Sequence, residues 1–368
     1  MRPLLTPIAQ GLPDTVPFTG PEALERRIGV PFRARVGANE CGFGPSPQVV
    51  KAVRAMAPDM WMYGDPEGFE LKAALAAKLG VPIASVAVGE GIDGLHGLIA
   101  RLVIAPGDVA VTSLGAYPTF NYHVAGFGGR IVFVPYAGYR EDLGALAEAA
   151  RRERAKVIYL SNPDNPMGTW WSAAEISSFI DAVPEETLVL LDEAYCETAP
   201  ASTLPALDVD RPNVIRTRTF SKAYGLAGMR VGYAIGEAGF IKAFDKVRNH
   251  FGVTRASQGA AIAALGDEAW LRDVVERVAA ARQRLYGIAG ENGLAAVESA
   301  TNFVAIGCGR DGAFALSVLK ALERRGVFVR KPMAPGLDQH IRISVGPEAE
   351  MDVVAAELPL ALREATAG

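Results

Sequence analysis

The chain contains few cysteines and few histidines. Cys41, Cys196 and Cys308 are scattered over 368 residues, so they do not form the dense disulfide framework of small secreted domains. The four histidines show no spacing typical of a zinc site, and we therefore predict no metal. So little cysteine favours a reducing compartment.

The sequence also lacks an excess of charge of one sign and a long apolar run. It has 37 Lys and Arg residues against 41 Asp and Glu residues, without a basic cluster, so we expect no nucleic-acid partner. No run approaches the roughly 20 apolar residues of a membrane span. Pro, Gln and Gly interrupt residues 1–18, which lack the continuous apolar segment of an export signal. We therefore expect a cytoplasmic protein without a membrane partner.

What the chain does contain is the balance of a large globular fold, with 50% apolar and 21% charged residues. Its length favours about two to three domains. Between residues 85 and 235, short β-branched runs alternate with helix-patterned stretches, which predicts an α/β fold with a mainly parallel sheet. Seven runs are the expected strands: VAVG at Val86, VAVTS at Val109, IVFVPY at Ile131, VIYL at Val157, LVLLD at Leu188, VIRTRTF at Val214 and VGYAIG at Val231.

Helix-patterned stretches separate these runs, among them 93–104, 142–152 and 172–182. Ser172, followed three residues later by Glu175, has the spacing of a capping box. Beyond residue 266 the pattern changes to a long helix over 268–291, strand-like TNFVAIG, VFVRK and IRISVG, and helices over 313–325 and from 348. We predict a large domain over 49–266, a smaller α+β domain over 267–368, and an N-terminal arm with part of the small domain over 1–48.

Four polar segments follow expected strands: GEGID, SNPDNPMG, DEAY and SKAYGLAGMR. Ligands of open α/β sheets gather beyond the carboxyl ends of the strands. Taken singly, each segment has an ordinary explanation as a turn, a helix cap or a solvated lysine. Their order and combination, however, resemble the signature of fold-type I aminotransferases that use pyridoxal phosphate (PLP), and the resemblance covers nearly the whole chain.

Within that superfamily the chain most resembles the histidinol-phosphate aminotransferase group. GANECGFGPSP resembles its Asn-Glu-Asn-Pro arm, MYGDPEG its Tyr-Pro-Asp-Pro segment and HIRISVGPEAEM its Leu-Arg-Ile-Thr-Val-Gly stretch. The resemblance implies a three-layer large domain with a seven-stranded sheet, plus the smaller α+β domain. It also implies a ping-pong transfer of an amino group between an amino acid or amine and a 2-oxo acid such as 2-oxoglutarate.

Two residues carry the covalent and electronic chemistry that the resemblance implies. Lys222 forms the imine with PLP and moves the proton at the substrate Cα, and burial beside cations should lower its pKa for this task. Asp192 ends a very apolar strand, where a carboxylate needs a buried cation. The resemblance supplies that cation as the protonated pyridine nitrogen of PLP.

The cofactor phosphate is expected where a helix begins. Gly91, Ile92 and Asp93 open the helix after VAVGE, where free N–H groups and the helix dipole attract an anion. Ile92 and Asp93 should therefore contribute main-chain donors. The resemblance adds Ser221 and Arg230, and a guanidinium can donate two parallel hydrogen bonds to a phosphate.

The resemblance assigns further side chains to the cofactor ring. Asn165 and Tyr195 match residues that hydrogen-bond the ring hydroxyl oxygen. Phe120 falls where the family places an aromatic ring stacked on the cofactor, and Tyr117 and Tyr122 are the alternatives.

Substrate binding and assembly are also implied by the resemblance. Tyr63 matches a tyrosine that reaches the partner's cofactor phosphate, which implies a homodimer with shared active sites. Arg342 matches the arginine that binds the substrate α-carboxylate, and a guanidinium suits this role because it can donate two hydrogen bonds to one carboxylate. Arg330 matches a residue that contacts the substrate phosphate. Asn39, in the arm, should line the entrance.

The chain departs from the subgroup around the expected mouth of the pocket. The arm reads NECGFG, Met167 replaces a common threonine, and RNHFGVTRASQ differs from the usual Pro-Tyr-Asn-Val segment. We hypothesise that His250 or Arg255 adds a polar or cationic group near the substrate side chain, so that an aromatic or other donor is an alternative to histidinol phosphate.

Two other functions are alternatives to transamination. A PLP-dependent decarboxylase or lyase, similar to phosphothreonine decarboxylase, uses the same scaffold, and motifs do not fix which bond at Cα is broken. A PLP-binding regulator would need a DNA-binding module ahead of the body, but residues 1–48 show no helix-turn-helix pattern and no basic excess.

Overall fold

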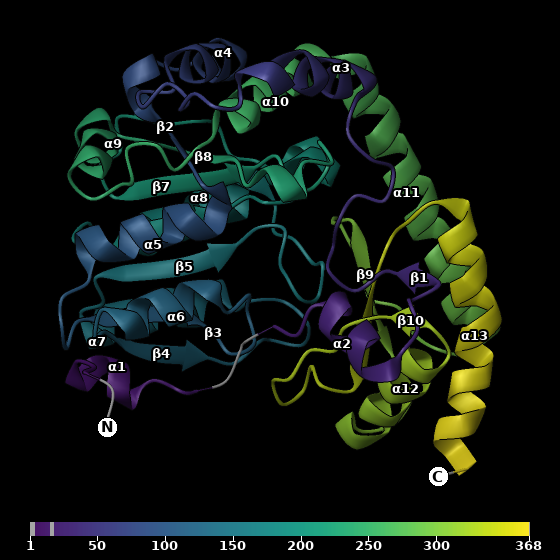
Figure 1. Ribbon diagram of the computed structural model, residues 1–368. Helices are drawn as coiled ribbons and strands as arrows, with labels where there is room; N and C mark the ends of the chain where they lie inside the picture. Colours follow the sequence, from purple (N-terminus) through teal and green to yellow (C-terminus); the bar gives the residue numbers. More distant parts are fainter. Residues whose placement is uncertain (1–3, 15–17, 368) are drawn as a thin grey trace.

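The computed structural model of the chain describes residues 4–14 and 18–367. The central strands are β2 (Val86–Gly89), β3 (Val109–Ser113), β4 (Arg130–Val134), β5 (Val157–Ser161), β6 (Leu188–Asp192), β7 (Val214–Thr219) and β8 (Gly232–Gly236). They form one seven-stranded sheet in the order β2-β8-β7-β6-β5-β3-β4 (Figure 1). β8 runs antiparallel to β2 and β7, whereas the other neighbouring pairs are parallel. The predicted α/β fold with a mainly parallel sheet is therefore confirmed.

Helices cover both faces of this sheet. α5 (Gly91–Val103), α6 (Thr119–Gly126) and α9 (Ala238–Ala243) pack on one face, and α7 (Leu143–Glu153) and α8 (Ala173–Ala182) pack on the other. Within β5, Tyr159 packs with the first group, while Ile158 and Leu160 pack with the second. Strands that are apolar on both sides require cover on both sides, which explains the three layers. The predicted capping box opens α8, where the Ser172 N–H donates to the Glu175 carboxylate at 2.8 Å.

A second group of helices covers the β2–β8 end of the sheet. α3 (Pro47–Met56), α4 (Phe69–Leu79) and α10 (Arg255–Gly266) share a core with the apolar side chains of β2 and β8 (Figure 1). Short 3₁₀ turns connect several elements: Ala57–Asp59, Ile83–Ser85, Cys196–Thr198, Ala201–Thr203, Ala227–Met229 and Phe244–Lys246.

The C-terminal part of the chain forms a smaller α+β layer beside the sheet. It comprises α11 (Glu268–Glu291), β9 (Phe303–Gly307), α12 (Gly312–Arg324), β10 (Val327–Phe328), β11 (His340–Ser344) and α13 (Glu348–Ala367). β9 and β11 pair antiparallel, and α11, α12 and α13 enclose a separate core with them. The division of the chain after residues 48 and 266 stays a prediction.

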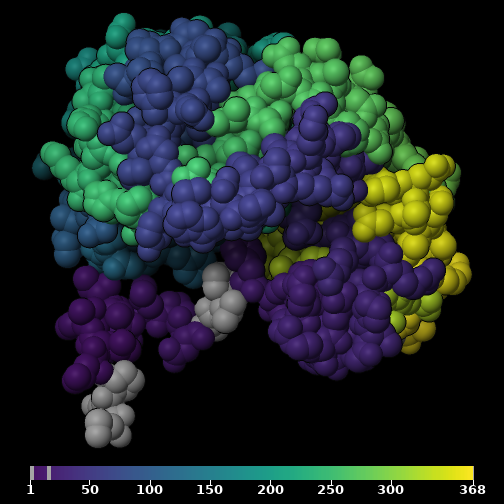
Figure 2. Space-filling view, turned by 45° about the horizontal axis from the view of Figure 1, so that its top comes forward, coloured from purple at the N-terminus to yellow at the C-terminus, as the bar shows by residue number. Residues whose placement is uncertain are grey.

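From α2 (Pro21–Ile28) onward, the N-terminal segment belongs in space to this C-terminal layer, whereas α1 (Pro7–Gly11) contacts α6 on the sheet. After these two helices, the short strand β1 (Ala34–Arg35) pairs parallel with β10. An ion pair of 2.7 Å joins Arg33 to Glu357 of α13, and Figure 2 shows the purple N-terminal segment against the yellow C-terminal helix. Residues at the two ends of the chain therefore build one layer together.

This arrangement puts the strand ends opposite the smaller layer. The carboxyl end of β5 points toward the C-terminal elements, and its parallel neighbours β6 and β7 end at the same edge (Figure 1). The polar segments of the sequence follow these strands. Over residues 4–14 and 18–367, each helix is too short or too polar to cross a membrane.

Candidate active site

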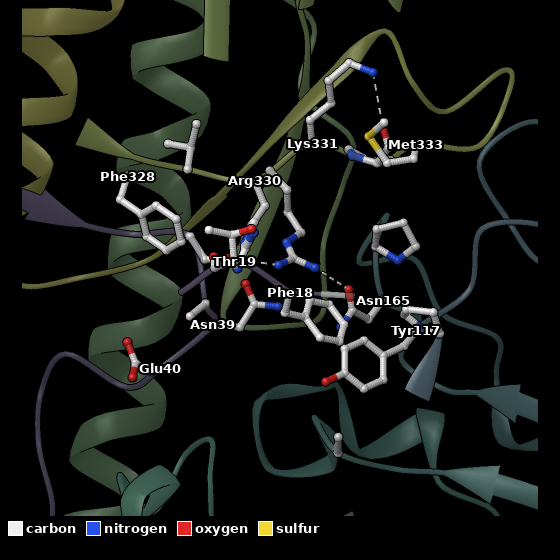
Figure 3. A pocket seen from close by; sticks show the side chains of 18 of the residues that line it. Phe18, Thr19, Asn39, Glu40, Tyr117, Asn165, Phe328, Arg330, Lys331 and Met333 are labelled. Carbon is white, nitrogen blue, oxygen red and sulfur yellow. Dashed lines mark hydrogen bonds between the residues drawn. The ribbon is translucent and has the colours of Figure 1, made fainter. Parts of the chain in front are cut away.

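A cavity of about 850 Å³ lies between the strand ends and the smaller layer. Most of the side chains predicted for the site line it: Asn39, Ile92, Asp93, Asn165, Asp192, Tyr195, Ser221, Lys222, Arg230, Arg330 and Arg342. Figure 3 shows Asn39, Asn165 and Arg330 around this cavity. The fold thus brings together residues that are up to about 300 positions apart in the chain.

Lys222 follows β7 and projects into the cavity. Its ammonium Nζ donates a hydrogen bond to the carbonyl oxygen of Asn39 at 3.2 Å. Burial, together with the nearby Arg342 guanidinium, lowers the pKa of Lys222 to about 8. A lysine with such a pKa supplies neutral amine close to neutral pH, as a residue that forms an imine must.

Asp192 ends β6 and is 4% exposed. Its Oδ1 accepts a hydrogen bond from the Ala194 N–H at 2.9 Å, and its Oδ2 accepts one from the Tyr159 hydroxyl at 2.8 Å. Burial raises the pKa of Asp192 to about 6. The His96 ring lies 3.9 Å from Oδ2, but burial lowers the pKa of His96 to about 3, so this ring is neutral. Among the described residues, Asp192 forms no ion pair with a lysine or an arginine, although the charge of Lys222 favours its ionised form. Such a buried carboxylate fits a ligand that brings a positive charge.

Tyr195 lies close to Asp192 and is held by two amides. Its hydroxyl oxygen accepts hydrogen bonds from Asn39 Nδ2 at 3.0 Å and from Asn165 Nδ2 at 3.3 Å. Burial raises the pKa of Tyr195 well above its usual value, so the phenol keeps its proton. Because both amides donate, that proton is free to be donated to a ligand oxygen in the cavity.

An anion site forms where α5 begins. Gly91 has φ +78°, and a Cβ at this position would lie 2.6 Å from Arg230 Nη2, so the close approach requires glycine. Arg230 Nη1 lies 3.4 Å from Ser221 Oγ, which also accepts from the Thr219 hydroxyl at 2.9 Å. Guanidinium, hydroxyl and helix N–H groups converge there, which is the donor set that a phosphate requires.

Arg330 and Arg342 lie side by side on the smaller layer. Their backbones pair through hydrogen bonds of 3.1 and 2.7 Å, and both side chains reach the cavity. Arg330 donates to the carbonyl of Thr19 at 2.7 Å (Figure 3), while Arg342 donates to Asn165 Oδ1 at 2.5 Å and has a buried Nε without a partner. Among the described residues, neither guanidinium forms an ion pair with a carboxylate. Two partly buried cations without an acid partner favour an anionic ligand.

The placement of Phe120 differs from its expected stacking role. Phe120 is 1% exposed, does not line the cavity, and stacks instead on Tyr159 with ring centres 5.4 Å apart. Tyr117, the nearest alternative, lines the cavity and stacks on Phe18 at 5.8 Å (Figure 3). Tyr122 does not line it. Phe120 turns inward because its helix packs against the sheet core.

Three other predicted residues lie outside the cavity of their own chain. Tyr63 is 75% exposed, and its ring lies 4.6 Å from that of Phe251. Arg255 Nη2 donates to the carbonyl of Tyr63 at 3.0 Å, and neither Arg255 nor the exposed His250 lines the cavity. A role for these residues in a site would require a second chain.

Several residues that line or support the cavity were not predicted. Phe18 and Thr19 lie in an N-terminal segment without periodicity, and nothing in their sequence marks them. Arg27 and Lys320 look like ordinary solvated charges on helices. Tyr159 could have been noticed, because a tyrosine in a strand that is otherwise apolar needs a partner for its hydroxyl.

Comparison with known proteins places the chain in a family. A family model for aminotransferase class I and II matches residues 35–358. The chain belongs to this family. It is 36% identical to histidinol-phosphate aminotransferase 2 of Carboxydothermus hydrogenoformans, over 96% of this chain and 98% of the relative. It is 37% identical to the histidinol-phosphate aminotransferase of an Anaeromyxobacter species, over 97% of this chain and 98% of the relative.

A solved structure supports the same assignment. The histidinol-phosphate aminotransferase of Sinorhizobium meliloti, in complex with pyridoxal-5′-phosphate, matches with a TM-score of 0.96 at 54% identity, covering 99% of this chain and 98% of that one. The chain is therefore a PLP-dependent aminotransferase, and its cavity has the donor groups that PLP requires. The comparisons favour transamination over the decarboxylase, lyase and regulator alternatives.

Proposed function

We propose that this aminotransferase uses histidinol phosphate as its amino donor and a 2-oxo acid such as 2-oxoglutarate as its acceptor. The observation that carries the proposal is the pair of guanidinium groups of Arg330 and Arg342, which face the cavity without an acid partner among the described residues. A donor with a phosphate and an acceptor with two carboxylates would each use these cations. The names of the two relatives and of the Sinorhizobium meliloti structure support this choice.

The same proposal assigns roles toward the cofactor. Lys222 holds PLP covalently and moves the proton at the substrate Cα, while Asp192 faces the ring nitrogen. Asn165 and Tyr195 bind the ring oxygen. When bound, PLP supplies an electron sink for the carbon that loses its proton. Ser221, Arg230 and the main-chain N–H groups of Ile92 and Asp93 hold the phosphate, with Gly91 allowing the close approach.

We assign the aromatic contact with the cofactor ring to Tyr117 in place of Phe120. Tyr117 lines the cavity together with Asp192 and Asn165, whereas Phe120 is enclosed by the core. Stacking on a ring requires an accessible face, which Tyr117 offers.

The donor is tested by kinetics with paired compounds. With 2-oxoglutarate as acceptor, kcat/KM for histidinol phosphate should exceed that for histidinol by about 100-fold, since charge-assisted hydrogen bonds to the phosphate are lost. Arg330→Gln should lower kcat/KM for histidinol phosphate by about 10- to 100-fold. It should lower kcat/KM for glutamate by a smaller factor. Arg324→Gln, which alters an arginine paired with Glu364 outside the cavity, is the matched control. A higher kcat/KM for an aromatic amino acid than for histidinol phosphate would overturn the proposed donor.

The proposal includes a homodimer in which Tyr63 serves the partner's site. Trp61, Tyr63 and Phe251 are 81%, 75% and 49% exposed, which is unusual for large aromatic side chains on a monomer surface. Arg255 holds the backbone of Tyr63 in place. Burial of these rings against a second chain would complete each cavity.

Subunit complementation tests the shared site. Lys222→Ala and Tyr63→Ala chains, each inactive or strongly impaired alone, should form hybrid dimers in which one site has both intact residues. Such hybrids should recover about half of the wild-type activity, one site of two. Ultracentrifugation that finds a monomer, or hybrids without recovery, would contradict the shared site.

A cytoplasmic location is part of the proposal. Cys196 and Cys308 are buried and free, and Cys41 is also unpaired. Free thiols persist in a reducing compartment, which supports this location. Fractionation of cells that express the untagged chain would test it.

A further inference from the structure

Tyr159 is a buried tyrosine directly beneath the cavity. It lies in β5, next to β6, and its side chain is fully buried. Its hydroxyl donates to Asp192 Oδ2 at 2.8 Å. Burial raises the pKa of Tyr159 far above its usual value, so the phenol keeps its proton around neutral pH. While Asp192 is ionised, the hydrogen bond therefore runs from the phenol to the carboxylate.

The ring of Tyr159 is fixed by aromatic neighbours on two sides. Phe120 stacks on it at 5.4 Å with an interplanar angle of 21°, and His96 meets it edge-on at 5.4 Å. A ring clamped in this way cannot turn its hydroxyl away from Asp192 without disturbing the core. The inward position of Phe120 thus supports Tyr159.

Within the described part of the chain, few groups stabilise the charge of Asp192, and Lys222 does so only by its charge, without forming an ion pair. The Ala194 N–H donates to Oδ1 at 2.9 Å, and Tyr159 is the side-chain donor to Oδ2. His96 Nε2 lies 3.2 Å from Thr217 Oγ1 and 3.9 Å from Oδ2, and its neutral ring cannot replace a cation. The hydroxyl of Tyr159 therefore opposes the burial that favours the protonated carboxyl.

We propose that Tyr159 is a positioning residue that keeps Asp192 ionised and aimed at the ring nitrogen of PLP, so that the shared proton resides on the nitrogen. A hydrogen bond to a carboxylate makes it less basic. The proton between the carboxylate and the pyridine nitrogen then stays on the nitrogen, where it strengthens the electron sink. This role of Tyr159 rests on the proposed position of Asp192 at the ring nitrogen, which the Asp192→Asn signal tests separately, and it does not depend on the proposed donor.

The test reads the protonation state of the ring nitrogen directly. Holoenzyme reconstituted with PLP that is ¹⁵N-labelled at the ring is examined by ¹⁵N NMR in the wild type, in Tyr159→Phe and in Asp192→Asn, which provides the reference for a neutral ring. The Tyr159→Phe signal should move from the pyridinium position toward that of Asp192→Asn. In Tyr159→Phe, the rate of the half-reaction with glutamate should fall by about 10- to 100-fold, which corresponds to the loss of one hydrogen bond to a charged group.

Tyr136→Phe is the matched control, because the Tyr136 hydroxyl also donates to a carboxylate, that of Asp164, at 2.8 Å. Its ¹⁵N signal should stay at the wild-type position. Melting curves of the apoproteins show whether either variant loosens the fold. An unmoved ¹⁵N signal in Tyr159→Phe, or an equal movement in Tyr136→Phe, would overturn the proposal.

Discussion

Asn39 Nδ2 donates a hydrogen bond to the hydroxyl oxygen of Tyr195 at 3.0 Å, joining two residues that are 156 positions apart. The same asparagine accepts from the Ser344 hydroxyl at 2.9 Å, and its carbonyl oxygen accepts from Lys222 Nζ at 3.2 Å. Its backbone has φ +55°, a left-handed conformation that asparagine tolerates better than most residues. The N-terminal segment is thus part of the wall of the cavity.

The first prediction separates the backbone role of Asn39 from its side-chain role. Asn39→Ala should lower both the stability, by about 1 to 3 kcal/mol, and kcat/KM, because it strains the left-handed backbone and removes a donor to Tyr195. Asn39→Gly tolerates the backbone conformation and should recover most of the stability but not kcat/KM. Urea unfolding and steady-state kinetics measure the two effects. Full activity of Asn39→Gly would show that the side-chain contacts are dispensable.

The second prediction concerns the stability of the apoprotein. Asp192 is buried, and its pKa is raised from 3.8 to about 6, so keeping it ionised at pH 7.5 costs the folded state up to about 3 kcal/mol. Asp192→Asn should therefore stabilise the apoprotein at pH 7.5 by about 1 to 3 kcal/mol while it weakens PLP binding. Urea unfolding at one protein concentration measures the first effect, and equilibrium dialysis the second.

The pH dependence supplies the control for this prediction. Below a pH of about 6 the folded state takes up a proton on Asp192, so the cost of burying this carboxyl falls with pH and vanishes near its ordinary pKa of 3.8. The advantage of Asp192→Asn should therefore shrink as the pH falls from 7.5 toward 4. An advantage that is constant over this range would mean that the charge of Asp192 is not its cause.

The fold was predictable where the pattern is local. The β-branched runs at Val86, Val157 and Leu188 became strands because each is long enough and is covered on both faces. β1 is only two residues long and exists because it pairs with Val327 and Phe328, nearly 300 positions away. No periodicity of residues 1–48 could reveal that pairing.

The site was predictable where strand ends carry unusual side chains. Asp192 is the last residue of β6 and Lys222 lies three residues beyond β7, and parallel strands end at one edge. Phe120 was placed by its position in the motif alone, but its orientation depends on how α6 packs on the sheet. Phe18 reaches the cavity through the path of the N-terminal segment, which tertiary contacts decide.

The third prediction follows from the lowered pKa of Lys222. In the apoprotein, the rate at which this amine reacts with pyridoxal should rise with pH, with a midpoint near pH 8, because only the neutral amine attacks the aldehyde. Arg342→Gln removes a neighbouring cation that lowers the pKa, so the midpoint should move upward and the reaction at pH 7 should slow. Borohydride reduction and peptide mass mapping confirm that Lys222 carries the label. A midpoint that Arg342→Gln leaves in place would exclude this electrostatic coupling.

The last prediction tests the anion site at the start of α5. Gly91→Ala must place a Cβ 2.6 Å from Arg230 Nη2 at a φ of +78°, so the Arg230 guanidinium has to move away from the phosphate position. We expect the affinity for PLP to fall by about 10- to 100-fold, the equivalent of losing one charge-assisted hydrogen bond. Gly228→Ala is the matched control, because a Cβ at this position, in the turn before Arg230, meets no atom within 4 Å. Equilibrium dialysis of the two apoproteins should show weakened binding in Gly91→Ala alone, and equal binding by both variants would rule out the close packing of Gly91 against Arg230 as a requirement for holding the phosphate.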